Sequence, residues 1–346
     1  MGVLSTRRGA HHSGQSNAGR AVVSLFAAAG QHRSELPGRN DIVKMNTVVG
    51  QHIRRTPVVR VAAGDIGGVV ATGTVPLTLK LEHLQCSGSF KARGAFANLL
   101  TRNVPPAGVL AASGGNHGVG VAYAAARLGV PAHIFVPTVS AAEKVERIRK
   151  LGANLVIAGD RYSDALAVAD AFAAESGALS IHAFDQYETI AGQGTLAVEL
   201  AEQAPELSTV LVPVGGGGLI AGIAAFFGDS VRVVGVEPTG APTLTRARAH
   251  GEPVDAPTDG IAADALAPRQ VGGLTFSIAE TYVDDVVLVD DDGIADAQRI
   301  LWERLRIIAE PAGAVGIAAL RTGAYRPGPN EHVGVVITGA NTAATT

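Results

Sequence analysis

Short apolar runs alternate with helical stretches along most of this 346-residue chain. In the first half, helical stretches over 117–128, 141–151 and 163–176 are each followed by a glycine, the residue most often found where a helix ends. The apolar runs beside them contain the β-branched and aromatic side chains that are typical of buried strands. These runs cover residues 109–112, 133–136, 155–158 and 179–182. Strands separated by helices predict an α/β fold in which helical crossovers join parallel strands.

The rest of the chain repeats this alternation as far as a last strand close to the C-terminus. The predicted helices are 41–55, 190–204, 219–227, 293–308 and 312–320, and the predicted strands are 77–81, 210–214, 231–236 and 333–337. No break in composition marks a domain boundary.

The composition favours a soluble globular protein with one large or two medium domains. Apolar residues make up 47% of the chain, charged residues make up 17%, and the formal net charge is −3, so we expect no basic surface for nucleic acid or for membranes. No uninterrupted apolar segment reaches the ~18 residues that would favour a membrane-spanning helix. The lone cysteine, Cys86, cannot form an internal disulfide, which favours a reducing cytoplasm. No thiol-activating pattern surrounds Cys86, so we expect no catalytic thiol.

The first forty residues differ from the rest. Residues 1–19 are rich in glycine, serine, histidine and arginine and have no periodicity, which is typical of a disordered segment. The apolar run 21–29 resembles the core of a signal peptide, but it starts late and lacks a convincing cleavage site. We therefore interpret residues 1–40 as an N-terminal extension that the fold does not need.

Lys91 lies in the stretch Ser-Phe-Lys-Ala-Arg-Gly (89–94), where a loop leads into a predicted helix. A lysine is normally a strongly solvated surface cation. A lysine held between an aromatic and a small residue at such a junction suits covalent chemistry, such as a Schiff base with an aldehyde cofactor. The alternative is a surface lysine on an amphipathic helix, and these six residues alone do not decide between the two.

Three further segments lie where predicted strands end. They are Ser-Gly-Gly-Asn-His-Gly (113–118), four consecutive glycines (215–218) and Thr-Gly-Ala-Asn (338–341). Ligands in open α/β sheets bind at the carboxyl ends of the strands. Four glycines before a helix let backbone N–H groups approach a phosphate, and the positive end of the helix points at the same place. The alternative for the glycines is a flexible loop or tight turn.

Together these four segments resemble the fold-type II pyridoxal-phosphate enzymes, and most of all their threonine/serine dehydratase and serine racemase branch. The resemblance covers residues from 41 to the C-terminus and implies an architecture like that of the tryptophan synthase β subunit. Two open, twisted, parallel-rich α/β domains would hold pyridoxal phosphate in the cleft between them. We expect a small domain over 108–184, a large domain over 41–107 and 185–346, and a homodimer.

The resemblance implies cofactor contacts in all four segments. Lys91 would carry pyridoxal phosphate, Asn116 would hydrogen-bond its phenolic oxygen, and Thr338 would face its pyridine nitrogen. A neutral hydroxyl at that nitrogen makes a weaker electron sink than a carboxylate would, which favours β-elimination over transamination. A strand-capping threonine is the alternative for Thr338. The remaining cofactor contacts would be Phe90, Gly215, Gly216, Gly217, Gly218 and Leu219.

By the same resemblance, Ser113, Gly114 and Gly115 would hold the substrate carboxylate at a helix N-terminus, a place that suits an anion. An ordinary helix cap at this place is the alternative, and it is compatible with a site. His117 would continue the substrate loop, with a structural role favoured over acid–base work. Gly260 would line the substrate pocket.

Two acidic residues complete the resemblance. Glu310 matches another segment of the family, and we expect it near the cofactor ring. Glu237 matches the first acid of a divalent-cation site, followed by a carbonyl at Ala241, but Thr243 stands where the second acid would be. Loss of one of two hard carboxylates weakens Mg²⁺ or Ca²⁺ binding, so no tight metal site is predicted.

The resemblance favours deaminating dehydration of L-threonine, L-serine or both. Ala92 after the lysine and His117 after the asparagine match the dehydratases rather than the cysteine and threonine synthases. Family racemases have a serine at the position of Gly114, which has no side chain to donate a proton, so we expect little racemisation. Serine racemisation, dehydration of another hydroxy amino acid and non-catalytic cofactor binding remain alternatives. The chain stops soon after Asn341, so a C-terminal regulatory domain is not expected.

Overall fold

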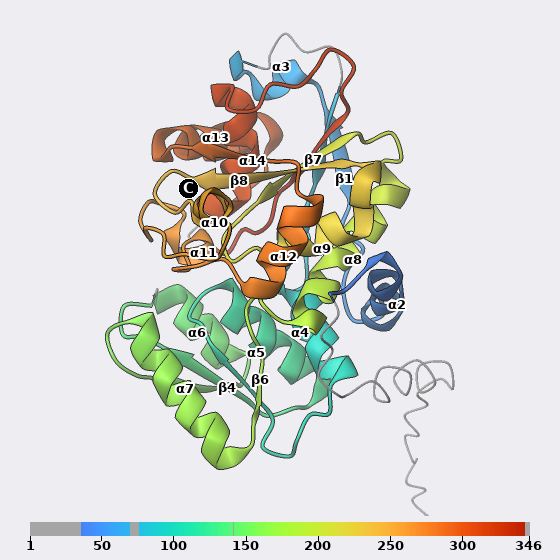
Figure 1. Ribbon diagram of the computed structural model, residues 1–346. Coiled ribbons are helices and arrows are strands. Elements are labelled where there is room, and N and C mark those ends of the chain that lie inside the picture. The colour runs from blue at the N-terminus through green and yellow to red at the C-terminus, as the bar shows by residue number, and fades with distance from the viewer. Residues whose placement is uncertain (1–35, 70–75, 141, 343–346) are drawn as a thin grey trace, which may run out of the picture.

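The computed structural model describes residues 36–69, 76–140 and 142–342. Their helices and strands form two α/β parts, each built on one sheet (Figure 1). Most of the predicted N-terminal extension lies outside the described residues. Its last residues are described, and the helix α2 already begins at Arg39.

The larger sheet has six strands. In their order across the sheet they are β1 (Val58–Val61), β2 (Leu77–Lys80), β10 (Val333–Val336), β7 (Thr209–Pro213), β8 (Arg232–Pro238) and β9 (Asp285–Val289). β1 pairs with β2 in antiparallel register, and all other neighbours are parallel. The carboxyl ends of β10 and β7 therefore lie at the same edge, which brings residues 215–218 and 338–341 to one side of the sheet.

The smaller sheet has four parallel strands. Their order is β5 (Asn154–Ile157), β4 (Ala132–Val136), β3 (Val109–Ala112) and β6 (Leu179–Ser180). All four strands fall within 108–184, the range predicted for the small domain. With α5, α6 and α7 they form the lower part of the molecule in Figure 1.

Helices cover both sheets. The helices of the first half are α2 (Arg39–Val49), α3 (Ala63–Ile66), α4 (Lys91–Thr101), α5 (Asn116–Leu128), α6 (Ala142–Lys150), α7 (Tyr162–Ser176) and α8 (Tyr187–Gln203). Those of the second half are α9 (Gly218–Phe227), α10 (Thr243–His250), α11 (Ala263–Leu266), α12 (Gly273–Tyr282), α13 (Asp291–Leu305) and α14 (Pro311–Thr322). Short 3₁₀ turns lie at Glu82–Leu84 and Gly228–Ser230.

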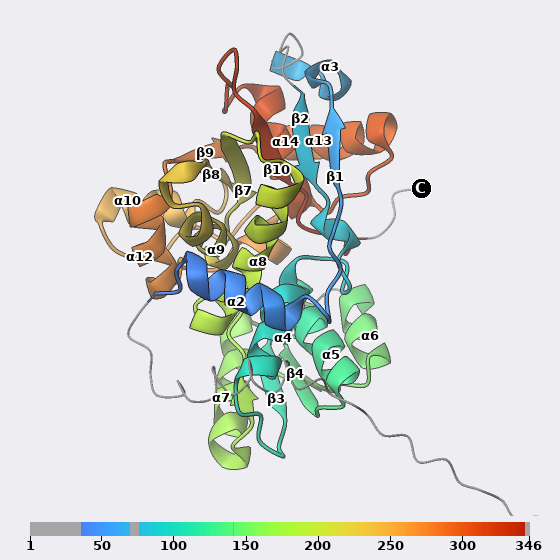
Figure 2. The ribbon, with the colours of Figure 1, turned by 90° about the vertical axis from the view of Figure 1, so that its right-hand side faces the viewer.

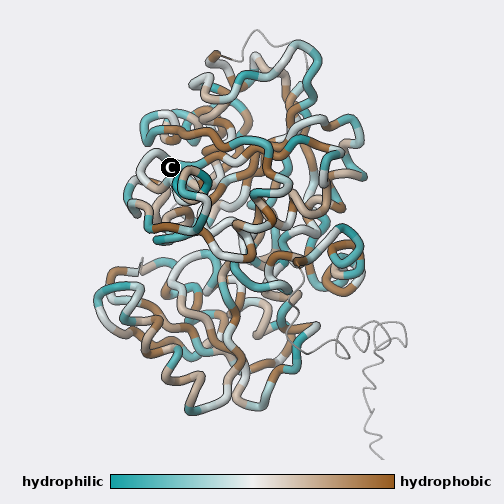
Figure 3. Tube along the Cα trace, viewed as in Figure 1, coloured by the Kyte–Doolittle hydropathy of each residue, from teal (hydrophilic) through white to brown (hydrophobic). Residues whose placement is uncertain are grey.

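The two faces of the large sheet belong to different cores. In β7, Val210 and Val212 pack with α8 and α9, while Leu211 between them packs with α13 and α14. This alternation is the period of two that a strand imposes on its side chains. Figure 3 shows the apolar segments running through the inside of both parts.

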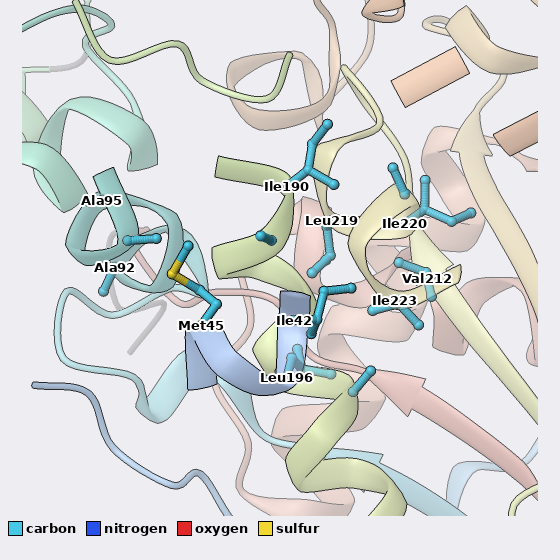
Figure 4. Close-up of a cluster of buried hydrophobic side chains, with 14 of the residues drawn as sticks. Ile42, Met45, Ala92, Ala95, Ile190, Leu196, Val212, Leu219, Ile220 and Ile223 are labelled. Atoms are coloured by element: carbon cyan, nitrogen blue, oxygen red, sulfur yellow. The ribbon is translucent and has the colours of Figure 1, made fainter. Parts of the chain in front are cut away.

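The helix α2 closes the first of these cores. Ile42 and Met45 are fully buried and pack among side chains of α4, α8 and α9, including Ala92 and Ile190 (Figure 4). Figure 2 shows α2 lying across α8 and close to α4, the helix that begins at Lys91. Burial of an Ile or Met side chain contributes about 1.5–3 kcal/mol, so α2 stabilises the helix that carries the candidate catalytic lysine.

Most predicted elements are present in the structure, and the glycines predicted to end three helices adopt positive φ angles of 67° (Gly129), 80° (Gly152) and 70° (Gly177). The predicted helix 41–55 is wrong at its end, because the helix stops at Val49 and Gly50 is its C-cap. The chain after Gly50 has other contacts, since the carbonyl of Thr56 accepts hydrogen bonds from the buried Lys80 and the partly buried Gln203.

Candidate active site

Lys91 reaches the end of β10 because two distant segments pair. The Phe90 N–H donates to the Thr338 carbonyl at 3.1 Å, and Ser89 forms an isolated antiparallel bridge with Gly339. On the far side of this bridge the Ala340 N–H donates to the Gly88 carbonyl at 3.0 Å. The start of α4 and the segment that follows β10 are thereby held together.

The Lys91 amine lies in a buried environment that disfavours its protonated form. Its Nζ donates to the Ala183 carbonyl at 2.7 Å and lies 5.2 Å from the centre of the Phe90 ring. Removal from water lowers the pKa of Lys91 to about 8, although the Glu310 carboxylate acts in the opposite direction. A lysine of this pKa loses its proton close to neutral pH, as an amine nucleophile or base must.

The hydroxyl of Thr338 is buried and available for a hydrogen bond. The residue is 2% exposed, and its Oγ1 has no hydrogen-bond partner among the described residues. A buried polar atom without a partner costs about 1–3 kcal/mol, so such an atom calls for an explanation. A ring nitrogen of a bound cofactor fits as its missing partner.

The glycine loop turns from β7 into α9 with no room for side chains. Gly217 has a φ of +89°, and a Cβ there would lie 3.0 Å from Thr275. A Cβ on Gly216 would overlap the Phe184 ring, and one on Gly218 would lie 2.8 Å from the Phe184 backbone. Leu219 follows inside α9 and is buried. Bare backbone at the N-terminus of a ten-residue helix fits a phosphate group.

The loop between β3 and α5 carries the predicted substrate contacts. The Ser113 hydroxyl oxygen accepts from the Gly115 N–H at 3.3 Å, so it caps the turn locally. A Cβ on Gly114 would overlap the Ser140 hydroxyl, and one on Gly115 would lie 3.2 Å from the Asp264 carbonyl. This loop therefore lies between the segment after β4 and the short helix α11.

Asn116 connects this loop to the large sheet. Its Nδ2 donates to Glu310 Oε1 at 2.5 Å, and its Oδ1 accepts from Asn341 Nδ2 at 2.7 Å. Asn341 in turn donates to the Ser87 carbonyl at 3.1 Å and accepts from Arg147 of α6. The amide predicted to face the cofactor is thus held by Glu310 and Asn341, and Asn341 is itself held by Ser87 and Arg147.

Glu310 is a buried carboxylate beside that amide. It is 3% exposed and precedes α14, and its backbone N–H donates to the Gly339 carbonyl at 3.0 Å. Burial raises the pKa of Glu310, and the cations Lys144 and Arg147 together with the Asn116 hydrogen bond act against that rise. A cavity of about 210 Å³ opens next to Glu310 and Asn341. Glu310 thus lies beside Asn116, and its expected place near a cofactor ring stays a prediction.

His117 and Gly260 have mainly structural contacts. His117 Nε2 lies 2.9 Å from the Ile181 carbonyl, and burial lowers the pKa of His117 to about 3, with the nearby Lys91 charge adding to the effect. The imidazole is therefore neutral and tied to the end of β6. Gly260 has a φ of +98° and packs against Asp291, the first residue of α13. A role for either residue in substrate binding stays a prediction.

The segment after β6 was missed by the sequence analysis. Ala183 accepts from Lys91, Phe184 packs on the glycine loop, and Asp185 accepts from the N–H groups of Gly273 and Leu274 at 3.0 and 2.9 Å. A signal was available, because this segment directly follows the predicted strand 179–182, and ligand sites in such sheets lie where strands end.

The Glu237 carboxylate accepts hydrogen bonds from the first turn of α10. It accepts from the Thr245 hydroxyl at 2.7 Å and from the N–H groups of Leu244 and Thr245 at 2.7 and 2.9 Å, and the Thr243 hydroxyl oxygen lies 3.0 Å away. Burial raises the pKa of Glu237, against the effect of these hydrogen bonds. Within the described ranges, no group of three or more His, Cys, Asp or Glu side chains is arranged to hold a metal ion. The described helices also include none that is long and apolar enough to cross a membrane.

Comparison with known proteins agrees with this geometry. An L-threonine ammonia-lyase of Geobacter sulfurreducens is 42% identical over 252 residues, which are 71% of this chain and 62% of the lyase, so the chain spans less than two thirds of that relative. The solved structure of maize serine racemase matches with a TM-score of 0.83 at 32% identity, covering 90% of this chain and 95% of the racemase. The solved structure of a threonine deaminase from T.th. matches with a TM-score of 0.82 at 35% identity, covering 90% of this chain and 100% of the deaminase.

These matches confirm the resemblance and the α/β fold class predicted from the sequence. The family model described as "Pyridoxal-phosphate dependent enzyme" matches residues 49–339, which include every residue predicted for the site. The chain belongs to the family of pyridoxal-phosphate-dependent enzymes.

Proposed function

We propose that the protein catalyses the deaminating dehydration of L-threonine, L-serine or both, with release of a 2-oxo acid and ammonia. The observation that carries this proposal is a backbone hydrogen bond between Phe90 and Thr338. It joins the residue before Lys91, a lysine of lowered pKa, to a threonine whose buried hydroxyl has no partner among the described residues. The similarity to an L-threonine ammonia-lyase and a threonine deaminase supports the same reaction.

Each part of the site has a distinct task in this proposal. Pyridoxal phosphate, when bound, supplies the electron sink that makes the Cα proton of the amino acid acidic. The Lys91 amine takes up that proton, and the neutral Ala183 carbonyl orients the amine without holding it in its charged form. The loop of Ser113, Gly114 and Gly115 at the N-terminus of α5 holds the substrate carboxylate.

Two further residues set the outcome of the reaction. Thr338 would be a neutral hydrogen-bond partner for the ring nitrogen, and a neutral partner there favours β-elimination over transamination. Asn116 holds the phenolic oxygen, and its own orientation is set by Glu310 and Asn341. The glycines 215–218 bind the phosphate.

Serine racemisation is the second candidate, and one observation favours it. The Ser140 hydroxyl occupies the space that a side chain on Gly114 would fill. A hydroxyl there stands where racemisation needs its second proton carrier, although Gly114 itself has no side chain. The structural similarity to maize serine racemase points the same way.

One experiment separates these reactions. The purified holoenzyme is incubated with L-threonine, L-serine and their D-isomers in deuterated water, and 2-oxo acid release is followed beside chiral chromatography of the amino acid. We expect 2-oxo acid to form from an L-isomer faster than the opposite isomer appears. If D-serine carrying deuterium at Cα accumulates faster than pyruvate, the protein is a racemase. Ser140→Ala then tests whether Ser140 carries the second proton.

We also infer that the protein works as a cytoplasmic homodimer whose small domain is 108–184. The lone cysteine supports a reducing compartment, and the confinement of the smaller sheet to 109–180 supports the domain boundaries. Light scattering of the purified protein tests the dimer, and a mass corresponding to one chain would reject it.

A further inference from the structure

The backbone carbonyls of the glycine loop accept hydrogen bonds from threonine hydroxyls. The Thr243 hydroxyl donates its one proton to the Gly215 carbonyl at 2.7 Å, which is nearer than Glu237 Oε1 at 3.0 Å. The Thr275 hydroxyl donates to the Gly216 carbonyl at 2.8 Å, which is nearer than the Gly272 carbonyl at 2.9 Å. Both threonines are fully buried. Each belongs to the first turn of a helix, α10 or α12, that lies outside the β7–α9 unit of the loop.

These carbonyl contacts determine where the loop amides point. A peptide unit is planar and trans, so its C=O and the N–H of the next residue point in opposite directions. When Thr243 holds the Gly215 carbonyl, the Gly216 N–H is directed to the other side of the chain. When Thr275 holds the Gly216 carbonyl, the Gly217 N–H is fixed in the same way. Glycine has little preference of its own for these orientations, so side-chain contacts must supply it.

Both threonines are anchored by carboxylates that have no other part in the site. Glu237 accepts from the N–H groups of Leu244 and Thr245, which fixes the start of α10 around Thr243. Asp185 accepts from Gly273, Leu274 and Thr275 N–H groups, which fixes the start of α12. Carboxylates at helix N-termini are stabilising, so each threonine is presented by a well-held first turn.

We propose that Thr243 and Thr275 are positioning residues that turn the amides of Gly216 and Gly217 toward the phosphate of pyridoxal phosphate. The proposal rests on the phosphate-binding role of the loop that is part of the proposed function. It assigns a task to Glu237 as well, because its carboxylate supports the loop through Thr243.

The test compares two ligands that differ only in the phosphate. Apoenzyme is titrated with pyridoxal phosphate and with pyridoxal, and binding is followed by fluorescence, for the parent and for the Thr243→Val and Thr275→Val variants. Loss of one hydrogen bond that orients a donor corresponds to a weakening of about tenfold. We expect this weakening for pyridoxal phosphate and a change of less than about twofold for pyridoxal.

The two variants should differ from each other. The Gly216 carbonyl also accepts from the Gly272 N–H at 3.2 Å, so it keeps a partner after Thr275→Val. We therefore expect Thr243→Val to weaken binding of pyridoxal phosphate more than Thr275→Val does. Thr243→Ser and Thr275→Ser keep the hydroxyl and should restore most of the affinity. If a valine variant does not fold, we compare the ³¹P resonance of the bound cofactor in the corresponding serine variant with that in the parent. We expect the same resonance in both.

The outcomes separate this proposal from the site itself. Gly217→Asp places a side chain and a negative charge in the loop, and it should abolish tight binding of pyridoxal phosphate. Unchanged affinity in Gly217→Asp would mean that the loop is not the phosphate site, and both proposals fail. Suppose instead that Gly217→Asp weakens binding of pyridoxal phosphate. If both valine variants then bind it like the parent, or lose affinity for pyridoxal and pyridoxal phosphate equally, only the role of the threonines is rejected. A serine variant with a shifted ³¹P resonance rejects it too.

Discussion

Lys80 and Lys91 are both lysines inside the protein, but their surroundings differ in how many hydrogen-bond acceptors and carboxylates face the amine. Lys80 on β2 is fully buried, and its Nζ donates to the Thr56 carbonyl at 2.8 Å, to Glu199 at 2.6 Å and to Gln203 at 2.9 Å. An ammonium group has three N–H donors, so every donor of Lys80 has an acceptor.

The region around Lys80 is also balanced in charge. Arg93, two residues after Lys91 on α4, donates to Glu82 at 2.7 and 2.8 Å and to Glu199 at 2.8 Å. Two cations therefore face two carboxylates, all of them buried. Burial lowers the pKa of Lys80, and both Glu82 and Glu199 oppose that shift.

Lys91 has one neutral acceptor, the Ala183 carbonyl, and one carboxylate, Glu310, that opposes the effect of burial on its pKa. The contrast shows what separates a structural from a reactive lysine in one core. A buried amine that is surrounded by acceptors and carboxylates is kept as a fixed charge. A buried amine with few of them gives up its proton near neutral pH and is free to react.

The largest expected effects come from replacing each lysine by methionine. Lys91→Met should lower the turnover of amino acid by more than about 1000-fold, because it removes the base of the reaction. It should leave the free energy of unfolding of the apoenzyme the same or higher. Reduction of the parent holoenzyme with borohydride, followed by peptide mapping, should find the cofactor on Lys91.

Lys80→Met should give the reverse pattern. It leaves Glu199 with a single cationic partner in a dry site, and breaking a buried ion pair costs about 3–5 kcal/mol of stability, measured by urea unfolding of the apoenzyme. The folded fraction should keep its turnover within a few-fold. Lys150→Met, at a side chain that is 75% exposed, is the matched control and should change neither quantity. Loss of turnover without loss of stability in Lys80→Met would contradict the contrast between the two regions.

The pH dependence of stability sharpens the same comparison. In the folded apoenzyme the pKa of Lys91 is about 8, against an ordinary value of 10.5, so between these values the unfolded chain binds more protons than the folded one. Stability then falls as the pH is lowered through this window. The stability of Lys91→Met relative to the parent should rise from pH 10.5 to about 8 and stay constant below it. Urea unfolding at several pH values measures this difference, and a flat difference would place the Lys91 pKa at its ordinary value.

The two regions also differ in how much of them could be predicted from the sequence. The candidate site around Lys91 is built from short local segments, so its residues could be predicted together from the sequence. The partners of Lys80 come from separate elements, and Glu199 lies 119 residues away from it. No local pattern marks such a cluster, because a buried ion pair depends on tertiary packing.

The same distinction applies to the fold. Central strands such as β3 and β7 stand out as short apolar runs, whereas β1 and β9 lie at the edges of the large sheet and were not predicted. In β9 only Val289 of the five residues is buried, so tertiary pairing with β8 decides its structure. The contacts of Thr243 and Thr275 with the glycine loop could not be predicted for the same reason, since a hydroxyl gives no sign of which carbonyl it will reach.

The smallest expected effect concerns two buried threonines, one in each region. Thr56 donates its hydroxyl to Glu82, whereas the Thr338 hydroxyl has no partner among the described residues. Thr56→Val should destabilise the apoenzyme by about 1–3 kcal/mol, because it leaves a buried carboxylate with one donor fewer. Thr338→Val should leave the stability of the apoenzyme unchanged or raise it by about 1 kcal/mol, because it removes a hydroxyl that the apoenzyme does not use. Titration with pyridoxal phosphate should then show weaker binding for Thr338→Val and parent-like binding for Thr56→Val. Thr338 is a structural residue if Thr338→Val destabilises the apoenzyme as much as Thr56→Val does and still binds the cofactor like the parent. The region around Lys91 would then lack the partner for the ring nitrogen that the proposed reaction needs.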